Sequence, residues 1–466
     1  MPAACVPFPG HESHRHEHKT VLIFIKRKFH NLVSDQKFSE ILTGSIWALG
    51  ARVIATLFGL IASIIIARCY GAEIMGIVAV LNSFLMLSSI VTVLGTNTSL
   101  LRLIPEHIVK YSPTSAFKVY RKTQLMVIAV SLIIGALFCF GADLIAEKVF
   151  SKPHLSSYFV LASVFIVFKS LQLLNTEAVR GLRLIKIFAL MQMLPHGFNL
   201  LILIFLGLLW PIRDVPIYAL LGGFALTGLL GWFIMEHTFK QKVAPMDIVH
   251  IMPSLKILSI SLPMFMTASM NFIIGETGVI MLGIFRPEAE VGYYAIAVKL
   301  ATLTAFILNA VNSMAAPKFS ELYHSDKIDE LFYVAKKSAK LIFWITTPIL
   351  LSLVILGKPI LHIAFGREFT VAYPAMFLLA LGQFVNSISG ATGLFMNMTG
   401  NQIVFRNIIF VAAVINIVLN LLLTARYGIY GAATAGMVSL VAWNITTLGY
   451  MKMKFGKTTG YFPKIA

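Results

Sequence analysis

The sequence predicts an all-α polytopic membrane protein with twelve transmembrane helices. Of its 466 residues, 58% are hydrophobic and 12% are charged, whereas soluble domains carry about a quarter charged residues. The apolar residues gather in twelve stretches, each with about the 20 residues that a helix needs to cross a bilayer. The 38 Lys and Arg residues are divided unequally between the loops on the two sides of these stretches, which predicts an orientation.

Each apolar stretch is expected to form one membrane helix. Gly, Ser, Thr and Ala recur within the stretches, as they do where membrane helices pack closely. Proline removes a backbone hydrogen bond from a helix, so we expect kinks at Pro195, Pro263, Pro348 and Pro374. The predicted spans are residues 43–68, 74–101, 123–146, 157–179, 186–209, 215–236, 257–285, 291–316, 341–364, 371–397, 405–424 and 428–451.

Basic residues determine the predicted orientation. One set of loops holds 27 Lys and Arg residues, the opposite set holds eight, and three lie inside the spans. The positive-inside rule therefore places both termini in the cytoplasm and the protein in the cell membrane. The net charge of +18 predicts contacts with anionic lipid headgroups and does not indicate nucleic-acid binding. The basic loops are residues 1–42, 102–122, 180–186, 237–256, 317–340, 398–406 and 452–466.

The segments outside the spans offer no site of covalent chemistry. No Gly-rich phosphate-binding loop and no metal-ligand spacing occurs in the loops, and Cys5, Cys69 and Cys139 are scattered. We therefore expect no enzyme activity, no cofactor and no metal site. The four histidines of residues 1–18 would suit a metal tract, but a disordered tail fits better because nothing apolar there could fold it. Residues 20–34 could form an interfacial basic helix.

The two halves of the chain repeat at an offset of 215 positions. Polar, charged and aromatic residues coincide at this offset, which chance seldom produces: Asn97 with Asn312, Glu106 with Glu321, Arg121-Lys122 with Lys336-Lys337, Phe150 with Phe365, Lys152 with Arg367, and Tyr158 with Tyr373. After slips of one and four residues, Gly76 meets Gly292 and Gly181 meets Gly400. The repeat predicts two six-helix lobes related by an axis along the membrane normal, with a central cavity between them.

This duplication divides the chain into five parts. We expect an N-terminal lobe at residues 43–236 and a C-terminal lobe at 257–451, joined by a cytoplasmic linker at 237–256. Cytoplasmic tails at 1–42 and 452–466 flank them. Rocking one lobe against the other would give alternating access to the cavity.

Arg52, Lys169 and Lys299 lie inside predicted spans, where a charge is costly and usually functional. No carboxylate lies at a matching depth in the spans next to Arg52 and Lys169. We therefore expect these two residues to face a wet cavity and bind an anionic group such as phosphate, which Arg grips with two parallel hydrogen bonds. The alternatives are a snorkelling side chain or an ion pair formed across the lobe.

Lys299 has a candidate partner in Glu276. The two residues are about equally far from the loop at 286–290, so they should sit at similar depth on adjacent antiparallel helices. A structural ion pair is the leading interpretation, and Glu276 as a proton- or cation-coupling carboxylate is the alternative. Amides inside the spans should bond between helices or contact sugar hydroxyls in the cavity. The amides selected as cavity candidates are Asn82, Asn97, Asn271 and Asn312.

Several segments together resemble a known family. They are Ala67–Gly76, which follows the first span, Leu94–Arg102 in the second, Glu290–Ala295, Asn416–Asn420 and Tyr427–Ala433. Over residues 40–455 their order and spacing resemble the Wzx-type polysaccharide-transporter flippases. The superfamily to which these flippases belong also includes the multidrug and toxic compound extruders and the lipid II flippases. The N-terminal 40 residues have no counterpart in the resemblance.

The resemblance implies a substrate and partners. The substrate would be an oligosaccharide on undecaprenyl diphosphate, such as an O-antigen, capsule or exopolysaccharide repeat unit, moved from the inner to the outer leaflet. A polysaccharide polymerase and glycosyltransferases would be its partners. A cationic cavity is expected, which Arg52 and Lys169 would suit.

Two other functions compete with this one. A cation-coupled multidrug exporter of the same superfamily should carry carboxylates in its cavities, yet Glu276 is the one clearly mid-membrane acid. A non-transporting scaffold of a glycan-assembly complex would not need the buried charges. A glycan polymerase or ligase generally needs a large outer loop, and the outer loops here are short.

Overall fold

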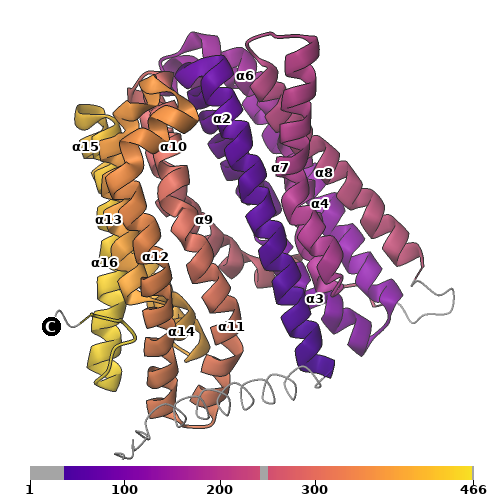
Figure 1. Cartoon of the computed structure of the whole chain (residues 1–466). Coiled ribbons are helices and arrows are strands. Elements are labelled where there is room, and N and C mark those ends of the chain that lie inside the picture. The colour runs from indigo at the N-terminus through magenta and orange to yellow at the C-terminus, as the bar shows by residue number, and fades with distance from the viewer. Residues whose placement is uncertain (1–35, 242–249, 464–466) are drawn as a thin grey trace, which may run out of the picture.

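The computed structural model describes residues 36–241 and 250–463, and every regular element in them is a helix (Figure 1). Residues 1–35 of the predicted tail at 1–42, its interfacial helix at 20–34 and the middle of the linker lie outside the described residues. We call residues 36–241 the first half and residues 250–463 the second half. In Figure 1 the first half lies on the right and the second on the left.

Long helices make up both halves. The helices of the first half are α2 (Gln36–Val93), α3 (Thr96–Lys110), α4 (Pro113–Phe140), α5 (Ala142–Leu144), the π turn η1 (Ile145–Val149), the 3₁₀ turn η2 (Pro153–Leu155), α6 (Ser156–Gly181), α7 (Ile185–Leu209) and α8 (Val215–Lys240). Those of the second half are α9 (Ser254–Phe285), α10 (Glu288–Ala301), η3 (Thr302–Thr304), α11 (Ala305–His324), α12 (Ile328–Phe365), η4 (Arg367–Ala372), α13 (Tyr373–Ser389), α14 (Thr392–Met398), α15 (Gln402–Tyr427) and α16 (Ile429–Phe455).

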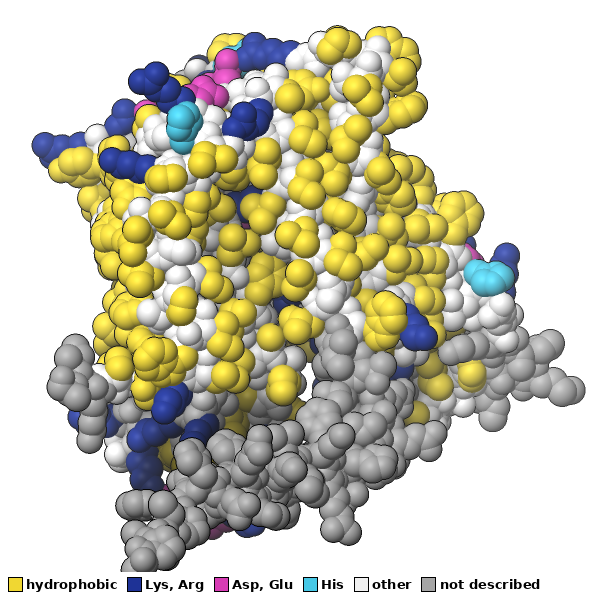
Figure 2. All heavy atoms as spheres, viewed as in Figure 1, with side chains coloured by type: hydrophobic (Ala, Val, Ile, Leu, Met, Phe, Trp, Pro, Cys, Tyr) yellow, Lys and Arg dark blue, Asp and Glu magenta, His cyan; other side chains and the backbone are white. Residues whose placement is uncertain are grey.

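The protein is a multi-pass membrane protein, as the sequence predicted. Within the described residues, eleven helical segments are long and apolar enough to cross a membrane. Figure 2 shows hydrophobic side chains covering the flank of the molecule, while Lys, Arg, Asp, Glu and His side chains gather towards its upper and lower ends. An apolar belt of this kind matches the hydrocarbon core of a bilayer.

The longest of these segments, Trp47–Val93, consists of two arms that meet at Gly71. Gly71 has φ 80° and ψ 177°, a region that essentially only glycine occupies. Gly59 and Ser83, equally far from Gly71 in the sequence, contact Lys299 and Glu276, which are themselves about equally far from the α9–α10 turn. The chain therefore reverses at Gly71. We call this the Gly71 end, and the end holding the start of α2 and the end of α16 the tail end.

The two halves pack most tightly near the Gly71 end, through a pair of glycines. A Cβ on Gly76 would lie 1.8 Å from the carbonyl oxygen of Glu288, and a Cβ on Gly292 would lie 2.2 Å from that of Ala72. Only glycine permits such close backbones. Gly76 and Gly292 are partners in the predicted repeat, and they lie against each other across the boundary between the halves.

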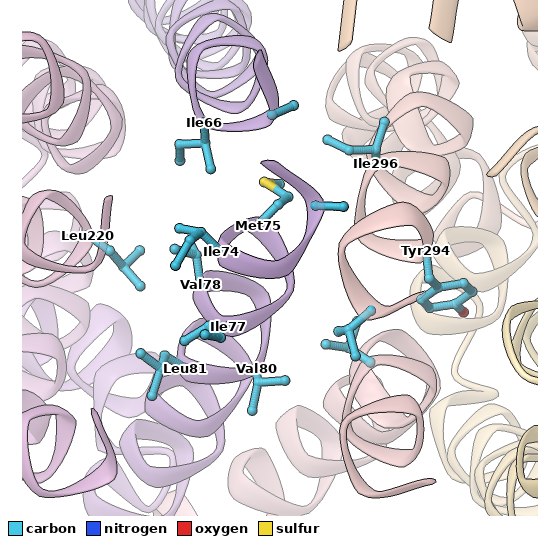
Figure 3. Packing of buried hydrophobic residues seen from close by; sticks show 14 of the residues in the cluster. Ile66, Ile74, Met75, Ile77, Val78, Val80, Leu81, Leu220, Tyr294 and Ile296 are labelled. Atoms are coloured by element: carbon cyan, nitrogen blue, oxygen red, sulfur yellow. The ribbon is translucent and has the colours of Figure 1, made fainter. Parts of the chain in front are cut away.

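A hydrophobic core surrounds this contact and includes residues of both halves. Figure 3 shows Ile74, Ile77 and neighbouring residues of the second arm of α2 between Leu220 of α8 on one side and Tyr294 and Ile296 of α10 on the other. The second arm of α2 therefore links α8 of its own half to α10 of the other half.

The structure corrects several predicted helix boundaries. Span 74–101 is broken at Leu94 and Gly95, span 291–316 contains η3, and span 371–397 is broken at Gly390. Helices α4 and α12 begin about three turns before the predicted spans, because a helix can continue into water with polar residues that hydropathy does not count. Pro374 lies in the first turn of α13, where proline is tolerated, so the predicted kink there is wrong. Pro195, Pro263 and Pro348 lie inside helices.

Candidate functional site

A cavity of about 230 Å³ lies between the two halves. The first arm of α2, helix α7 and the segment from α10 to α11 contribute its walls. Its lining, within the described residues, contains no Asp or Glu. The residues that line it are Arg52, Ala55, Thr56, Gly59, His196, Lys299, Thr302, Leu303, Ala305, Phe306 and Asn309.

The charged and titratable groups of this cavity are all basic. Arg52 comes from the first arm of α2, His196 from α7 and Lys299 from α10 of the other half. Gly59 leaves room for two of them, since a Cβ there would lie 3.5 Å from Nζ of Lys299 and 3.6 Å from Nδ1 of His196. A cavity lined in this way favours an anionic group. Its cations face neutral acceptors, carbonyl oxygens and hydroxyls, and an anion would add hydrogen bonds in which both partners are charged.

Lys299 reaches across the boundary between the halves. Its Nζ donates to the carbonyl oxygen of Gly59 and to Oγ of Ser63, both at 2.5 Å. The predicted ion pair with Glu276 is wrong, since Glu276 instead accepts a hydrogen bond from Ser83 Oγ at 2.5 Å. Sequence distance placed Lys299 and Glu276 at the same depth, but the two side chains contact different arms of α2.

Lys169 does not belong to the lining of this cavity. Its Nζ lies 3.8 Å from the centre of the Phe224 ring and donates to Gln172 Oε1 at 3.2 Å. A lysine over an aromatic face gains cation–π attraction, which increases where water is excluded. Lys169 and Lys299 are both close enough to His196 to act on it electrostatically. Lys169 therefore adds positive potential to the first-half wall of the cavity without a carboxylate partner among the described residues.

The four predicted cavity amides lie elsewhere. None of Asn82, Asn97, Asn271 and Asn312 lines the cavity between the halves. Ser83, next to Asn82, and Ser99, two residues after Asn97, bond to α9 rather than to the cavity, so depth in the sequence did not predict the facing side. Oδ1 of Asn312 is buried and has no hydrogen-bond partner among the described residues.

Sequence reasoning did not select four polar residues of the cavity, His196, Asn309, Thr56 and Thr302. His196 lies near the middle of predicted span 186–209, and a titratable group inside an apolar span is itself a signal of function. Counting only Lys and Arg overlooked it. Asn309 was one of many amides in the spans, and nothing in the sequence separated it from Asn312.

Polar contacts between the halves close the Gly71 end. Glu288 Oε1 lies 3.5 Å from Lys152 Nζ and 3.0 Å from His154 Nε2, and Lys152 also donates to the Arg286 carbonyl oxygen at 2.6 Å. Burial lowers the pKa of Lys152 from its usual value, and the adjacent Glu288 opposes that shift. Arg68 donates from Nε to the Ala364 carbonyl oxygen at 2.9 Å. The cavity lies on the tail-end side of these contacts.

Comparison with known proteins shows the family. A family model described as "Polysaccharide biosynthesis protein" matches residues 75–374, well over half of the chain. The chain belongs to this polysaccharide biosynthesis protein family. The resemblance inferred from the sequence is thereby confirmed at the level of the family.

Individual relatives are distant. A probable low-salt glycan biosynthesis flippase, Agl15, from Haloferax volcanii is 24% identical over 173 residues, so the match spans only 37% of that relative's length. The fold is shared with an inward-facing multidrug resistance MATE family transporter of the MOP superfamily, with TM-score 0.71 and 15% identity, covering 88% of this chain and 98% of that one. Lipid II flippase MurJ in an inward closed conformation gives TM-score 0.69 and 16% identity, covering 88% and 87%.

Proposed function

We propose that the protein is a flippase that moves an undecaprenyl-diphosphate-linked oligosaccharide from the inner to the outer leaflet of the cell membrane. The observation that carries this proposal is the cavity between the halves, whose titratable side chains are Arg52, His196 and Lys299 and whose lining, in the described part of the chain, contains no carboxylate. A diphosphate is the anionic part of such a substrate. The family and the flippase relative support a lipid-linked glycan as cargo.

In this proposal Arg52 is the main ligand of the diphosphate, because a guanidinium grips phosphate oxygens with two parallel hydrogen bonds. Lys169 acts at longer range from behind the wall that carries His196. Thr56, Thr302 and Asn309 offer neutral polar groups to the adjoining sugar. The polyprenyl chain remains in the surrounding lipid, since a cavity of about 230 Å³ cannot hold it.

The proposed topology has twelve crossings, with the two arms of α2 counted separately and both termini in the cytoplasm. The excess of Lys and Arg in the loops of the tail end supports this orientation. The cavity then lies on the cytoplasmic side of the contacts that close the Gly71 end, as a carrier awaiting cytoplasmic substrate requires. The halves act as the two lobes of an alternating-access carrier.

The membrane potential can help to drive the proposed step. One charge moved through 100 mV is worth about 2.3 kcal/mol, so two negative charges leaving an inside-negative cell gain roughly 4.6 kcal/mol per 100 mV. Coupling to an ion is therefore not required. Transport in proteoliposomes should accelerate when an inside-negative potential is imposed with potassium and valinomycin, and a rate that ignores the potential would contradict this driving force.

The test is Arg52→Ala in sealed vesicles that contain radiolabelled lipid-linked oligosaccharide. We expect the fraction of glycan reached by a membrane-impermeant glycosidase to fall at least tenfold, with normal protein abundance. Arg406→Ala is the matched control, because Arg406 is an exposed arginine outside the cavity. Arg52→Lys should retain part of the activity, since the charge remains but the paired hydrogen bonds are lost. Full activity of Arg52→Ala would refute the assigned site.

One observation favours a second candidate, a cation-coupled multidrug exporter. Glu276 is a half-buried carboxylate at the contact between the halves, hydrogen-bonded by Ser83. Ethidium export by cells that lack other exporters would distinguish this function from glycan flipping. The exporter would be favoured if Glu276→Gln lost ethidium export while Arg52→Ala exported ethidium at the full rate. Flipping by the purified protein alone would exclude a scaffold that does not transport.

A further inference from the structure

We propose that Lys299 is a latch that holds the two halves together when the cavity is empty, and that the diphosphate of the substrate releases it. This inference rests on the proposed function and goes beyond it, because it assigns to one cavity residue the link between substrate binding and movement. The juxtaposition that carries it is Lys299 of α10 against Gly59 and Ser63 of α2.

Lys299 forms the roof of the cavity. Along α2, the lining residues run from Arg52 to Gly59 and approach the Gly71 end. Along α10 and α11, they run from Lys299 to Asn309 and move away from that end. The contact between Lys299 and Ser63 therefore lies at the deep end of the cavity, between the cavity and the closed Gly71 end. Any motion that opens the Gly71 end has to separate α10 from α2 and break this contact.

The hydrogen bonds of Lys299 suit a contact that breaks and re-forms. An ammonium group has three donors, and Gly59 and Ser63 use two, so one remains for the cavity. Ser63 Oγ also donates to the Gly59 carbonyl oxygen at 2.9 Å. When Lys299 leaves, that carbonyl keeps a partner, and no buried backbone acceptor is left without a hydrogen bond.

A diphosphate is a competitor that can take Lys299 from these acceptors. In a bond from ammonium to phosphate both partners are charged, so Lys299 gains a Coulomb attraction that the neutral Gly59 carbonyl and Ser63 hydroxyl do not supply. No Asp or Glu among the lining residues competes for the ammonium. A neutral ligand would leave Lys299 on Gly59 and Ser63, so the latch responds to charge. The empty carrier stays closed at the Gly71 end, and the loaded carrier is free to open there.

The test measures the distance between the halves at the tail end by double electron–electron resonance. Spin labels are attached to Lys118→Cys on α4 and Lys327→Cys before α12, both exposed, in a protein whose three native cysteines are replaced by serine. The probe is farnesyl diphosphate, a short polyprenyl diphosphate, and farnesol is its uncharged counterpart. Binding of both is measured separately by calorimetry.

We expect two distances between the spin labels, one of them less populated, which we call the minor distance population. Farnesyl diphosphate, but not farnesol, should increase this population in the protein that carries only the labelling substitutions. Lys299→Met should increase that population without ligand by about tenfold to a hundredfold, the value of one charged hydrogen bond. Ser63→Ala should give a smaller change in the same direction, because it removes one acceptor and keeps every charge. Lys358→Met, which removes an exposed lysine outside the cavity, should change nothing.

The following results would contradict the latch, its release by substrate, or the proposed function. An unchanged distribution in both Lys299→Met and Ser63→Ala overturns the latch. Farnesyl diphosphate that binds without altering the distribution overturns release by substrate. Absence of any binding would contradict the proposed function instead, and the ligand-free comparison of Lys299→Met with Lys358→Met would still show whether Lys299 holds the halves together.

Discussion

Gly76→Ala is expected to weaken closure of the Gly71 end. The new Cβ would lie 1.8 Å from the carbonyl oxygen of Glu288 and 2.6 Å from its carbonyl carbon. Both atoms belong to the backbone of α10, so no rotamer change relieves the overlap. The second arm of α2 and α10 must move apart by about an ångström, and the core around Ile77 and Ile296 loses contacts with them.

The magnitude follows from two opposing effects. Forcing a methyl group into a packed interior costs about 1–3 kcal/mol, and this backbone overlap belongs at the upper end of that range. Replacing a helical glycine with alanine returns about 0.8–1 kcal/mol of helix propensity. Relative to the unfolded chain the net loss is then about 2 kcal/mol. Relative to the open state, which keeps the same helix, the propensity cancels and the closed state loses about 3 kcal/mol, or roughly a hundredfold in population.

Thermal unfolding in detergent, followed by tryptophan fluorescence, and the spin-label distance at the tail end provide the two measurements. Gly449→Ala is the matched control, because a Cβ on Gly449 would meet nothing within 4 Å. We expect Gly76→Ala to lower the Tm and to increase the second distance population, while Gly449→Ala leaves the distances unchanged and does not lower the Tm. Equal behaviour of the two variants would refute the close packing inferred at Gly76.

Further predictions concern the cavity and the contacts between the halves. Gly59→Leu should abolish flipping at normal protein abundance, because its side chain fills the space beside Lys299 and His196. Gly59→Ala should retain activity, because its Cβ would lie at ordinary contact distance from both side chains. Flipping assays in vesicles compare the two variants. Lys152→Met leaves the Glu288 carboxylate buried without its lysine, so the Tm should fall further in this single variant than in the double variant Lys152→Met with Glu288→Gln. Side-chain exposures of 13% for Lys152 and 11% for Glu288 support this coupling. An equal fall would show that the pair is uncoupled.

Much of the fold was predictable because its signals are local. Apolar runs and basic loops each depend on short stretches of sequence, and the eleven long apolar helical segments of the described residues follow the apolar runs. The extra turns of α4 and α12 were not predictable in this way, since a helix that leaves the membrane becomes polar. The break at Gly95 reflects contact with another half of the chain: a Cβ there would lie 2.4 Å from the Ser261 carbonyl oxygen.

The candidate site was predicted only in part. Sequence reasoning selected Arg52 and Lys299 as costly charges inside spans, and the structure places both around one cavity. It paired Lys299 with Glu276 because depth can be counted along a helix. It could not find that Lys299 turns to Gly59 and Ser63, residues more than 200 positions away, because the rotation of a helix about its axis depends on packing.

The sequence by itself determined that this is a membrane protein and which residues carry charge into the apolar region, and it predicts a duplicated helical plan with one basic side. These are properties of composition and order along the chain. Only the tertiary structure decided that Arg52, His196 and Lys299 share a cavity whose described lining includes no carboxylate, that Lys169 lies over the Phe224 ring outside that lining, and that Gly76 meets α10. Those facts depend on contacts between distant helices, which only the packed molecule brings together.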